Sequence, residues 1–158
     1  VQVIRLIWSG QRGVRFQGKH YQLRGAHTGP VPAHLMEIWI GGNKPRMLSL
    51  IGRLADGWIP SSPYVPPDQL IEKNDRINEA ALKAGRDPAK IRRIYNVMGE
   101  ITSGDRRGYL EGPVEYWVEE LNRLVEKCRM DSFIFGPKGS SEEQMRLFAE
   151  EVVPQVRD

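Results

Sequence analysis

The sequence lacks the features that would tie it to a membrane, a nucleic acid or an oxidising compartment. Its single cysteine, Cys128, cannot form an internal disulfide. No apolar run approaches the roughly 20 residues of a membrane span, and no signal-peptide pattern opens the chain. The 23 Lys and Arg and the 20 Asp and Glu residues are spread without a basic run, which argues against nucleic-acid binding. We expect a cytoplasmic protein with no membrane or nucleic-acid partner.

The composition is that of a folded domain. The chain has 158 residues, of which 40% are hydrophobic and 27% charged, so it lacks the low hydrophobicity and high net charge of a disordered protein. It opens with Val1 and not with methionine, and Val3, Ile4 and Ile7 already have helical spacing with no capping residue ahead of them. We expect one domain over residues 1–158 that is a piece of a longer protein.

Residues 10–35 have the pattern of a local excursion between larger elements. Val14 and Phe16, then Tyr21 and Leu23, alternate with polar residues on the two sides of Gly18, and a stretch rich in proline and glycine follows. Alternation around a glycine is typical of a hairpin, and proline and glycine mark a linker. We therefore expect a hairpin and linker here.

After this excursion, a short apolar run is followed by a helical pattern four times. Continuous apolar runs bounded by glycines are typical of parallel strands that are covered on both faces. A capping box from Ser140 to Glu143 is expected to begin the last helix. The expected strands are residues 37–42, 56–60, 91–101 and 132–137, and the expected helices are residues 44–54, 68–84, 113–128 and 140–153.

This order of elements predicts an α/β fold with a parallel sheet. Two architectures are compatible with it. A doubly wound sheet accepts four βα units as a minimal domain, whereas a closed barrel needs about eight units and roughly 250 residues. Length alone favours the open sheet, but a chain that begins inside an element is also what half of a barrel would look like.

The turn after the first of these strands has the pattern of a phosphate site. Gly41 and Gly42 end the strand, Asn43 is a suitable N-cap, and Pro45 is tolerated in the first turn of the helix. Glycines let a ligand approach the backbone, and the N–H groups and positive dipole end of a helix start favour a phosphate, to which Lys44 would add charge. The alternative is chain reversal alone, because the turn is neither G-x-G-x-x-G nor a P-loop.

These segments together resemble one family. "PVPAHLMEIWIGGNKPRMLSLIGRLADGWIPS" resembles the strand, Gly-Gly turn, arginine-containing helix and Ala-Asp-Gly-Trp strand of luciferase-like, flavin-dependent monooxygenases and reductases. "FQGKHYQL" is similar to the hairpin of that family, and "DSFIFGP" with "QMRLFAEEVVPQVR" to its last strand and closing helix. The resemblance covers nearly the whole chain, and the order of the pieces makes it specific.

The resemblance implies a (β/α)8 barrel that binds FMN or the deazaflavin coenzyme F420. This chain would be its carboxy-terminal half, about four βα units. "GPVEYWVEELNRLVEKCRMDSFIFGP" tilts the expectation slightly towards F420. No catalytic acid or base is implied, because the ring and substrate pockets come largely from the amino-terminal strands. The cofactor-binding residues implied by the family are Gly41, Gly42, Asn43 and Lys44 after one strand and Ile59, Pro60 and Ser61 after the next.

The implied function is that of a fragment of a flavin- or F420-dependent oxidoreductase, which would perform hydride transfer or monooxygenation on a small organic substrate. We expect the isolated chain to be inactive. A catalytically inactive cofactor-binding or interaction half-barrel is the alternative. Open strand edges and inward-facing side chains would be exposed in half of a barrel, so we also expect a homo-oligomer or association with a missing amino-terminal half.

The remaining reactive residues have ordinary explanations. His20, His27 and His34 recur every seven residues, but the intervening glycines and prolines forbid a helix that would align them, so we expect no metal site. Cys128 is expected to be an inert thiol. Glu100, the only acid expected at a strand end, is a candidate contact for the substrate or cofactor, but a pair with Arg93 or a place on a solvated rim is favoured. The tryptophans expected in the core are Trp8, Trp39, Trp58 and Trp117.

Overall fold

The structure is a computed structural model that describes residues 1–139 and 141–156. The chain divides into two compact units, Val1–Ile38 and Trp39–Asp158. None of the helices in the described ranges combines the length and the apolar character that a membrane crossing demands.

The first unit contains the expected helix and hairpin. Helix α1 is Gln2–Trp8, and strands β1, Val14–Gln17, and β2, Gln22–Ala26, pair antiparallel. The N–H of Gly18 donates to the carbonyl of Tyr21 at 2.9 Å, which closes the turn between the strands. The expected hairpin around Gly18 is therefore confirmed.

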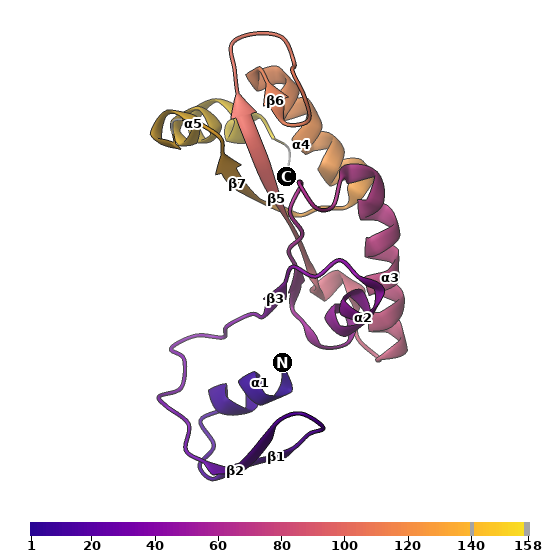
Figure 1. Ribbon diagram of the computed structural model, residues 1–158, viewed down its shortest axis with the longest axis vertical. Helices are drawn as coiled ribbons and strands as arrows, with labels where there is room; N and C mark the ends of the chain where they lie inside the picture. Colours follow the sequence, from indigo (N-terminus) through magenta and orange to yellow (C-terminus); the bar gives the residue numbers. More distant parts are fainter. Residues whose placement is uncertain (140, 157–158) are drawn as a thin grey trace. The chain divides into compact units, whose positions relative to one another are not determined.

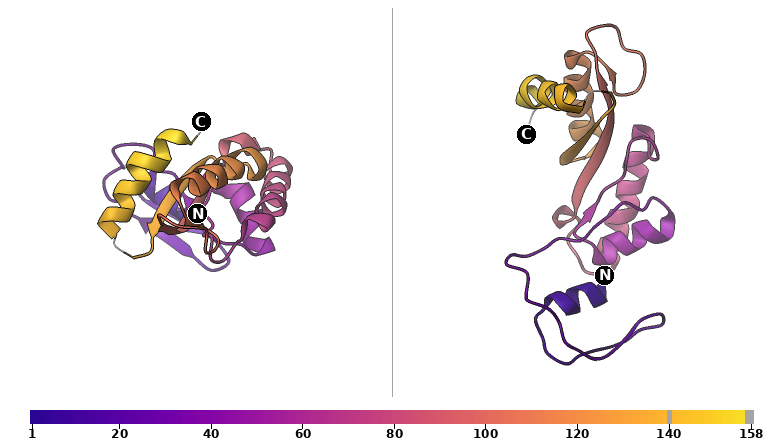
Figure 2. Two further views of the ribbon diagram at one scale, coloured as in Figure 1. Left: turned by 90° about the horizontal axis from the view of Figure 1, so that it is seen from above. Right: turned by 60° about the vertical axis from the view of Figure 1, so that its left-hand side comes forward.

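The second unit is built on parallel strands, and β5 is the central one (Figures 1 and 2). The N–H groups of Arg92, Asn96 and Glu100 donate to residues of the β4 and β6 segments, while β7 pairs along the other edge of β5. All four pairings among these strands are parallel. The strands are β3, Trp39–Ile40; β4, Gly57–Trp58; β5, Arg92–Ile101; β6, Glu111–Gly112; and β7, Ser132–Pro137.

Helices follow β3, β4, β6 and β7, and no helix separates β5 from β6. Helix α3 ends before Gly85, whose positive φ of 68° is suited to a helix terminus. Strand β6 lies within a segment that was expected to be a loop, and the last helix passes into a π turn at Phe148. The expected capping box involves Ser140, which lies outside the described residues. The helical segments are α2, Pro45–Leu54; η1, Pro67–Gln69; α3, Leu70–Lys83; η2, Pro88–Lys90; α4, Val114–Cys128; α5, Ser141–Leu147; η3, Phe148–Val152; and η4, Val153–Gln155.

The two faces of β5 have different surroundings. Successive side chains of a strand point to opposite faces. Tyr95 and Val97 belong to the buried core on the helix-facing side, where α3 and α4 run alongside the strand. On the other face Met98 of β5 is 41% exposed and Ile134 of β7 is 45% exposed. We call this side, with Trp39, Asn96, Met98 and Ile134, the uncovered face.

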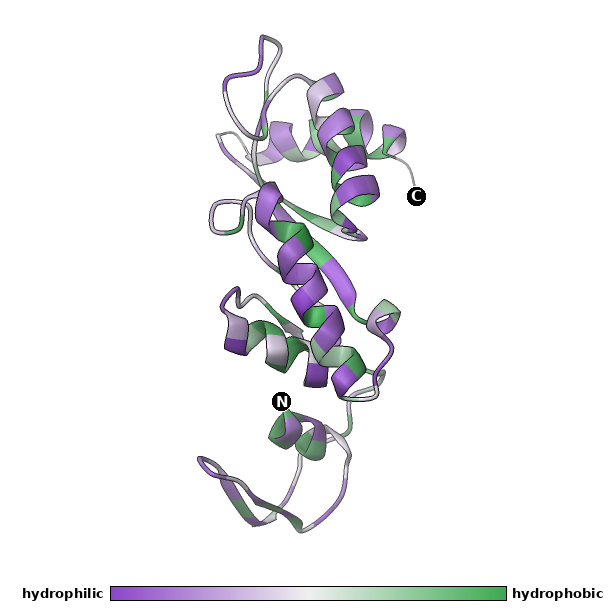
Figure 3. Cartoon of the chain, turned by 90° about the vertical axis from the view of Figure 1, so that its right-hand side faces the viewer, coloured by the Kyte–Doolittle hydropathy of each residue, from purple (hydrophilic) through white to green (hydrophobic). Residues whose placement is uncertain are grey.

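Two of the four tryptophans lie in the core. Trp58 and Trp117 are fully buried, and the Trp117 ring packs edge-on against Phe135 and Phe148 with centroids 5.3 and 6.0 Å away. Figure 3 shows hydrophobic residues interspersed with hydrophilic ones along the helices that supply this core. The prediction for Trp39 was wrong, because Trp39 is 43% exposed. It lies on β3, the edge strand of the sheet, and its side chain is on the uncovered face.

The carboxyl end of α2 is held by an arginine from a distant part of the chain. The Arg86 guanidinium donates to the carbonyls of Gly52 at 2.7 Å and Ala55 at 2.8 Å, and more weakly to Ile51 at 3.4 Å. The carbonyls of Gly52 and Ala55 lie at the end of a helix, where the last carbonyls lack a partner within the helix, whereas the Ile51 carbonyl also accepts from the N–H of Ala55 at 3.0 Å. A cation also stabilises the negative end of the helix dipole. Arg86 thereby links α2 to the turn that follows α3.

We expect Arg86→Met to lower the free energy of unfolding by about 1–3 kcal/mol, because charge-assisted hydrogen bonds to partly buried carbonyls are lost while the side-chain length is retained. Urea denaturation of both proteins measures the change. The matched control is Lys83→Met, which removes an exposed pair with Glu79 and should cost no more than about 0.5 kcal/mol. Equal effects of the two substitutions would contradict the role given to Arg86.

Candidate functional site

The candidate site lies where the parallel strands end. The carboxyl ends of parallel strands meet at one edge of a sheet, and loops from that edge carry the functional groups in α/β barrels. Here the segments that leave this edge are residues 41–44 after β3, 59–62 after β4, 102–110 after β5 and 138–139 after β7.

The first two of these segments lie side by side, as the sequence predicts. The Trp58 indole N–H donates to the carbonyl of Gly42 at 3.0 Å, and the backbone N–H of Ile59 donates to Ile40 at 3.1 Å. A Cβ atom on Gly41 would come within 3.0 Å of the Ile59 carbonyl oxygen. The structure therefore brings together the two groups of residues that the family resemblance implies.

Gly42 of the turn is needed for packing within the chain. A Cβ atom on Gly42 would lie 2.7 Å from the Cβ of Met47 in the first turn of α2. Neither Gly41 nor Gly42 has a positive φ. The sequence analysis explained both glycines by the close approach of a ligand. In the structure, packing against Met47 explains Gly42, while Gly41 is exposed.

The amino terminus of α2 has no side-chain cap. The prediction of Asn43 as the N-cap was wrong: the N-cap is Lys44, because Lys44 is the last residue with extended backbone, φ −87° and ψ 153°. The N–H groups of Met47 and Leu48 donate to the Lys44 carbonyl at 2.8 and 3.0 Å. Pro45 has no N–H, so within the described chain the Arg46 N–H is the helix-start donor without a partner.

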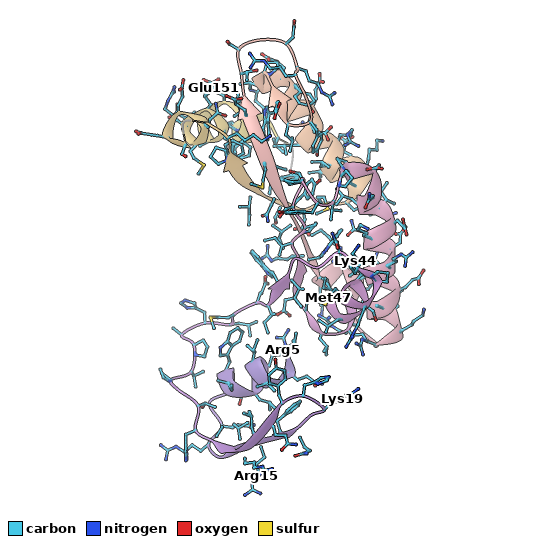
Figure 4. All side chains as sticks on the ribbon, viewed as in Figure 1. Arg5, Arg15, Lys19, Lys44, Met47 and Glu151 are labelled. Atoms are coloured by element: carbon cyan, nitrogen blue, oxygen red, sulfur yellow. The ribbon has the colours of Figure 1, made fainter. Side chains whose placement is uncertain are left out.

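This helix start is also positively charged. Figure 4 labels Lys44 and Met47 at the beginning of α2. The side chains of Lys44 and Arg46 are both exposed, and no acidic residue lies in the first turn. The helix dipole places a further partial positive charge here. The arrangement is able to bind an oxyanion such as a phosphate group.

The segment after β4 is fixed to β5 by a polar residue that the sequence analysis did not select. Asn96 donates through its side-chain Nδ2 to the Ser61 hydroxyl at 2.9 Å. Its backbone N–H donates to Pro60 and its carbonyl accepts from Ser62, both at 2.9 Å. The only sequence signal for Asn96 is a polar amide within a strand of otherwise apolar neighbours.

A tyrosine holds the continuation of this segment from the helix-facing side of β5. The Tyr95 hydroxyl donates to the carbonyl of Val65 at 2.6 Å, and burial raises the pKa of Tyr95, so it remains a neutral donor. The carbonyl of Ser61 accepts from the N–H groups of Tyr64 and Val65 at 2.9 and 3.0 Å. Residues 60–65 are therefore anchored on both sides.

Glu100 does not pair with Arg93, because the two residues lie at opposite ends of β5. The Arg93 guanidinium donates to the Asn78 side-chain oxygen and to the Ile91 carbonyl, each at 2.7 Å. Burial lowers the pKa of Arg93 to about 10, and the nearby Asp131 carboxylate partly offsets this effect. Glu100 is half-buried at the carboxyl edge of the sheet.

The carboxyl end of β5 is also closed by side chains. The Gln144 amide accepts from the N–H of Ile101 at 2.7 Å and donates to its carbonyl at 2.9 Å. This pair of bonds imitates a neighbouring strand and attaches α5 to the end of β5. Lys138 and Glu111 form an ion pair at 2.6 Å on the same edge. Gln144 was not selected from the sequence either.

The histidines and the cysteine do not form a reactive site. His20, His27 and His34 lie outside the helices and strands. Among the described residues, no group of three or more His, Cys, Asp or Glu side chains is placed to hold a metal ion. The Cys128 thiol is buried, 3.8 Å from the Pro67 carbonyl oxygen, and burial raises its pKa, with Arg123 acting in the opposite direction.

Solved structures identify the architecture of which this sheet is a part. An F420-dependent secondary alcohol dehydrogenase in complex with an F420–acetone adduct superposes on 99% of this chain and 60% of its own, with a TM-score of 0.79 and 18% identity. A riboflavin lyase with modified FMN and riboflavin superposes on 91% of this chain and 48% of its own, with a TM-score of 0.71 and 14% identity. Such neighbours are TIM barrels, so this chain has the fold of a half-barrel, and the open doubly wound sheet is excluded.

The sequence itself matches a known family. The model of the luciferase-like monooxygenase family matches residues 1–106, and the chain belongs to this family. A relative, the phthiodiolone/phenolphthiodiolone dimycocerosates ketoreductase of Mycobacterium sp. (strain JLS), is 36% identical over 91 residues, which are 56% of this chain and 24% of that protein. The chain thus spans about a quarter of the length of this curated relative.

We expect Cys128 to react with a thiol reagent such as DTNB at pH 8 at least about tenfold more slowly in the native chain than in guanidinium chloride, because burial keeps it protonated and inaccessible. The absorbance of the released thiolate measures both rates. Rapid stoichiometric labelling of the native chain would show that the thiol is reactive.

Proposed function

We propose that this chain is the carboxy-terminal half of an F420- or FMN-dependent oxidoreductase. The observation that carries the proposal is the uncapped, positively charged start of α2 at the carboxyl edge of the sheet, in a chain of the luciferase-like family. The F420-dependent dehydrogenase and the FMN-containing lyase with the same fold support this class of cofactor.

The residues at this edge suit a cofactor that carries a phosphate. The Arg46 N–H and the charges of Lys44 and Arg46 would hold the phosphate. Ser61 offers a hydroxyl group in the segment that follows β4. We propose the cofactor-binding set Gly41, Gly42, Asn43, Lys44, Ile59, Pro60 and Ser61. Gly41 leaves room at the exposed side of the turn, and half-buried Ile59 would provide apolar contact, whereas Pro60 is buried.

When bound, such a cofactor supplies hydride transfer or oxygen activation. The residues of this chain would bind and orient it and exclude water from one side. The substrate is proposed only as a small organic molecule, and no residue of this chain is assigned as an acid or base. We propose that the isolated chain is inactive, because the other half of the barrel lining is absent from it.

The uncovered face supports the proposal that this chain needs a partner. Trp39, Met98 and Ile134 are large apolar side chains exposed on one side of a parallel sheet, and parallel sheets are normally buried on both faces. We propose that the remaining βα units of a luciferase-like barrel cover this face, and that a second copy of the chain covers it when those units are missing. An inactive interaction half-barrel is the alternative function that this face favours.

A comparison of FMN with riboflavin tests the phosphate site. We expect the chain to bind FMN at least about tenfold more tightly than riboflavin, which lacks the phosphate, and the combined variant Lys44→Gln, Arg46→Gln to abolish this preference. Fluorescence titration measures both dissociation constants, with F420 titrated in parallel. The control is Lys90→Gln, at an exposed site before β5 and so at the opposite edge of the sheet.

Two results would count against this proposal. Equal affinity for FMN and riboflavin would show that the start of α2 does not bind the phosphate. Failure to bind either FMN or F420 at millimolar concentration would remove the cofactor proposal and leave the interaction half-barrel.

The uncovered face predicts association. We expect light scattering to give a mass that rises above that of the monomer with concentration, and Ile134→Asp to shift the equilibrium towards monomer, because a carboxylate on this face would have to be desolvated. Leu82→Asp is the control, since Leu82 is an apolar residue 65% exposed on α3. A wild-type chain that stays monomeric at all concentrations would contradict the prediction.

A further inference from the structure

We propose that Asn96 is a positioning residue that directs the Ser61 hydroxyl proton towards an acceptor oxygen of the bound cofactor. This inference rests on the function proposed above and deepens it. Asn96 lies on β5, outside the two segments that the family resemblance implies, and its side chain reaches one of them.

The first observation is the direction of the hydrogen bond. The Asn96 Nδ2 group can only donate, so at 2.9 Å the Ser61 oxygen is the acceptor. A hydroxyl has one proton of its own and accepts with its lone pairs. With Asn96 acting as donor to it, the Ser61 proton remains available to a different acceptor.

The second observation is that the pair is held rigidly. Asn96 and Ser61 are directly opposite each other in a parallel bridge. The backbone of Asn96 bonds to both neighbours of Ser61, to Pro60 through its N–H and to Ser62 through its carbonyl, at 2.9 Å each. Because backbone pairing fixes both Asn96 and Ser61, the Ser61 side chain loses little conformational freedom when it binds a ligand.

The third observation is where the pair lies. Asn96 is paired with Ile134 of β7 on its other side, and Ile134 is exposed on the uncovered face. The Asn96–Ser61 pair therefore belongs to the uncovered face and not to the helix-packed core. Ser61 also follows Ile59, whose carbonyl adjoins Gly41. Ser61 is therefore two residues along the chain from the contact with Gly41, which belongs to the turn that leads to the charged start of α2.

Charge favours an amide at this position. The positive charges of Lys44 and Arg46 favour an anionic ligand at this edge of the sheet, and a neutral amide side chain does not repel such a ligand. An aspartate of the same shape would accept the Ser61 proton and so reverse the hydrogen bond. It would also add a negative charge beside Ser61. With asparagine at this position the Ser61 proton is available to a ligand, whereas with aspartate it would be donated to the carboxylate, although the two side chains have nearly the same shape.

The experiment is a double-mutant cycle on the 158-residue chain, with the dissociation constant for FMN as the readout and F420 measured in parallel. The variants are Asn96→Ala, Ser61→Ala and both together, with Asn96→Asp added as the isosteric variant. Thermal melting and far-UV circular dichroism are recorded for each. We expect Asn96→Ala and Ser61→Ala each to weaken binding about tenfold, and the double variant to bind no more weakly than Ser61→Ala alone.

The Asn96→Asp variant distinguishes a role of Asn96 in positioning the Ser61 hydroxyl from a role in stabilising the fold. It preserves the shape of the side chain, so we expect its melting temperature to stay close to that of the wild type while FMN binding falls by more than tenfold. A purely structural Asn96 would instead give equal losses of affinity for Asn96→Ala in the presence and absence of the Ser61 hydroxyl, and that result overturns the inference.

The outcomes also distinguish the inference from the proposed function. If the wild type binds FMN or F420 and Asn96→Asp binds equally well, the inference falls and the cofactor function stands. If the wild type binds neither cofactor, the proposed function falls and the inference falls with it. If Asn96→Ala does not fold, FMN binding by Asn96→Asp is measured in the Ser61→Ala background. The Ser61 hydroxyl is absent there, so only the repulsion between the introduced carboxylate and the anionic ligand should remain. A loss of affinity as large as that in the wild-type background would overturn the inference.

Discussion

The pairing of β5 along both of its edges is the constraint on which the rest of the second unit depends. Its N–H groups alternate between β4 and β6 on one edge and β7 on the other, so one strand sets the register of the sheet. The same strand packs Tyr95 and Val97 against the helices and presents Asn96 to the segment after β4. A change in its register by one residue would exchange the two faces and remove the core and the site together.

Much of this arrangement was predictable from local patterns. Short apolar runs between glycines, followed by amphipathic helices, predicted the order of the βα units, because burial on both faces requires continuous apolar strands. The helix expected over residues 68–84 does end before Gly85, because few residues other than glycine tolerate the positive φ found there. Physical reasoning alone left open whether the sheet closes into a barrel, because closure depends on elements that these 158 residues do not contain; the resemblance to a family supplied that answer.

The features that were missed depend on contacts between residues far apart in the chain. Arg86 caps a helix 31 residues before it, Gln144 completes a strand 43 residues before it, and Asn96 reaches Ser61 across 35 residues. Their sequence neighbours do not indicate such partners. Trp39 was misjudged for a related reason: an apolar residue in a strand is buried only if something covers that face of the sheet. The N-cap of α2 is Lys44 and not the predicted Asn43. Local propensity does not resolve a difference of one residue at a helix end.

The alternation of side chains along β5 has an evolutionary consequence. Residues that pack against the helices and residues on the uncovered face occupy alternate positions of one ten-residue strand. Each set can therefore accept substitutions with little effect on the other. A lineage could exchange the side chain at Met98 while Tyr95 and Val97 continue to specify the same packing, so the surface of the uncovered face can change with little change in the core.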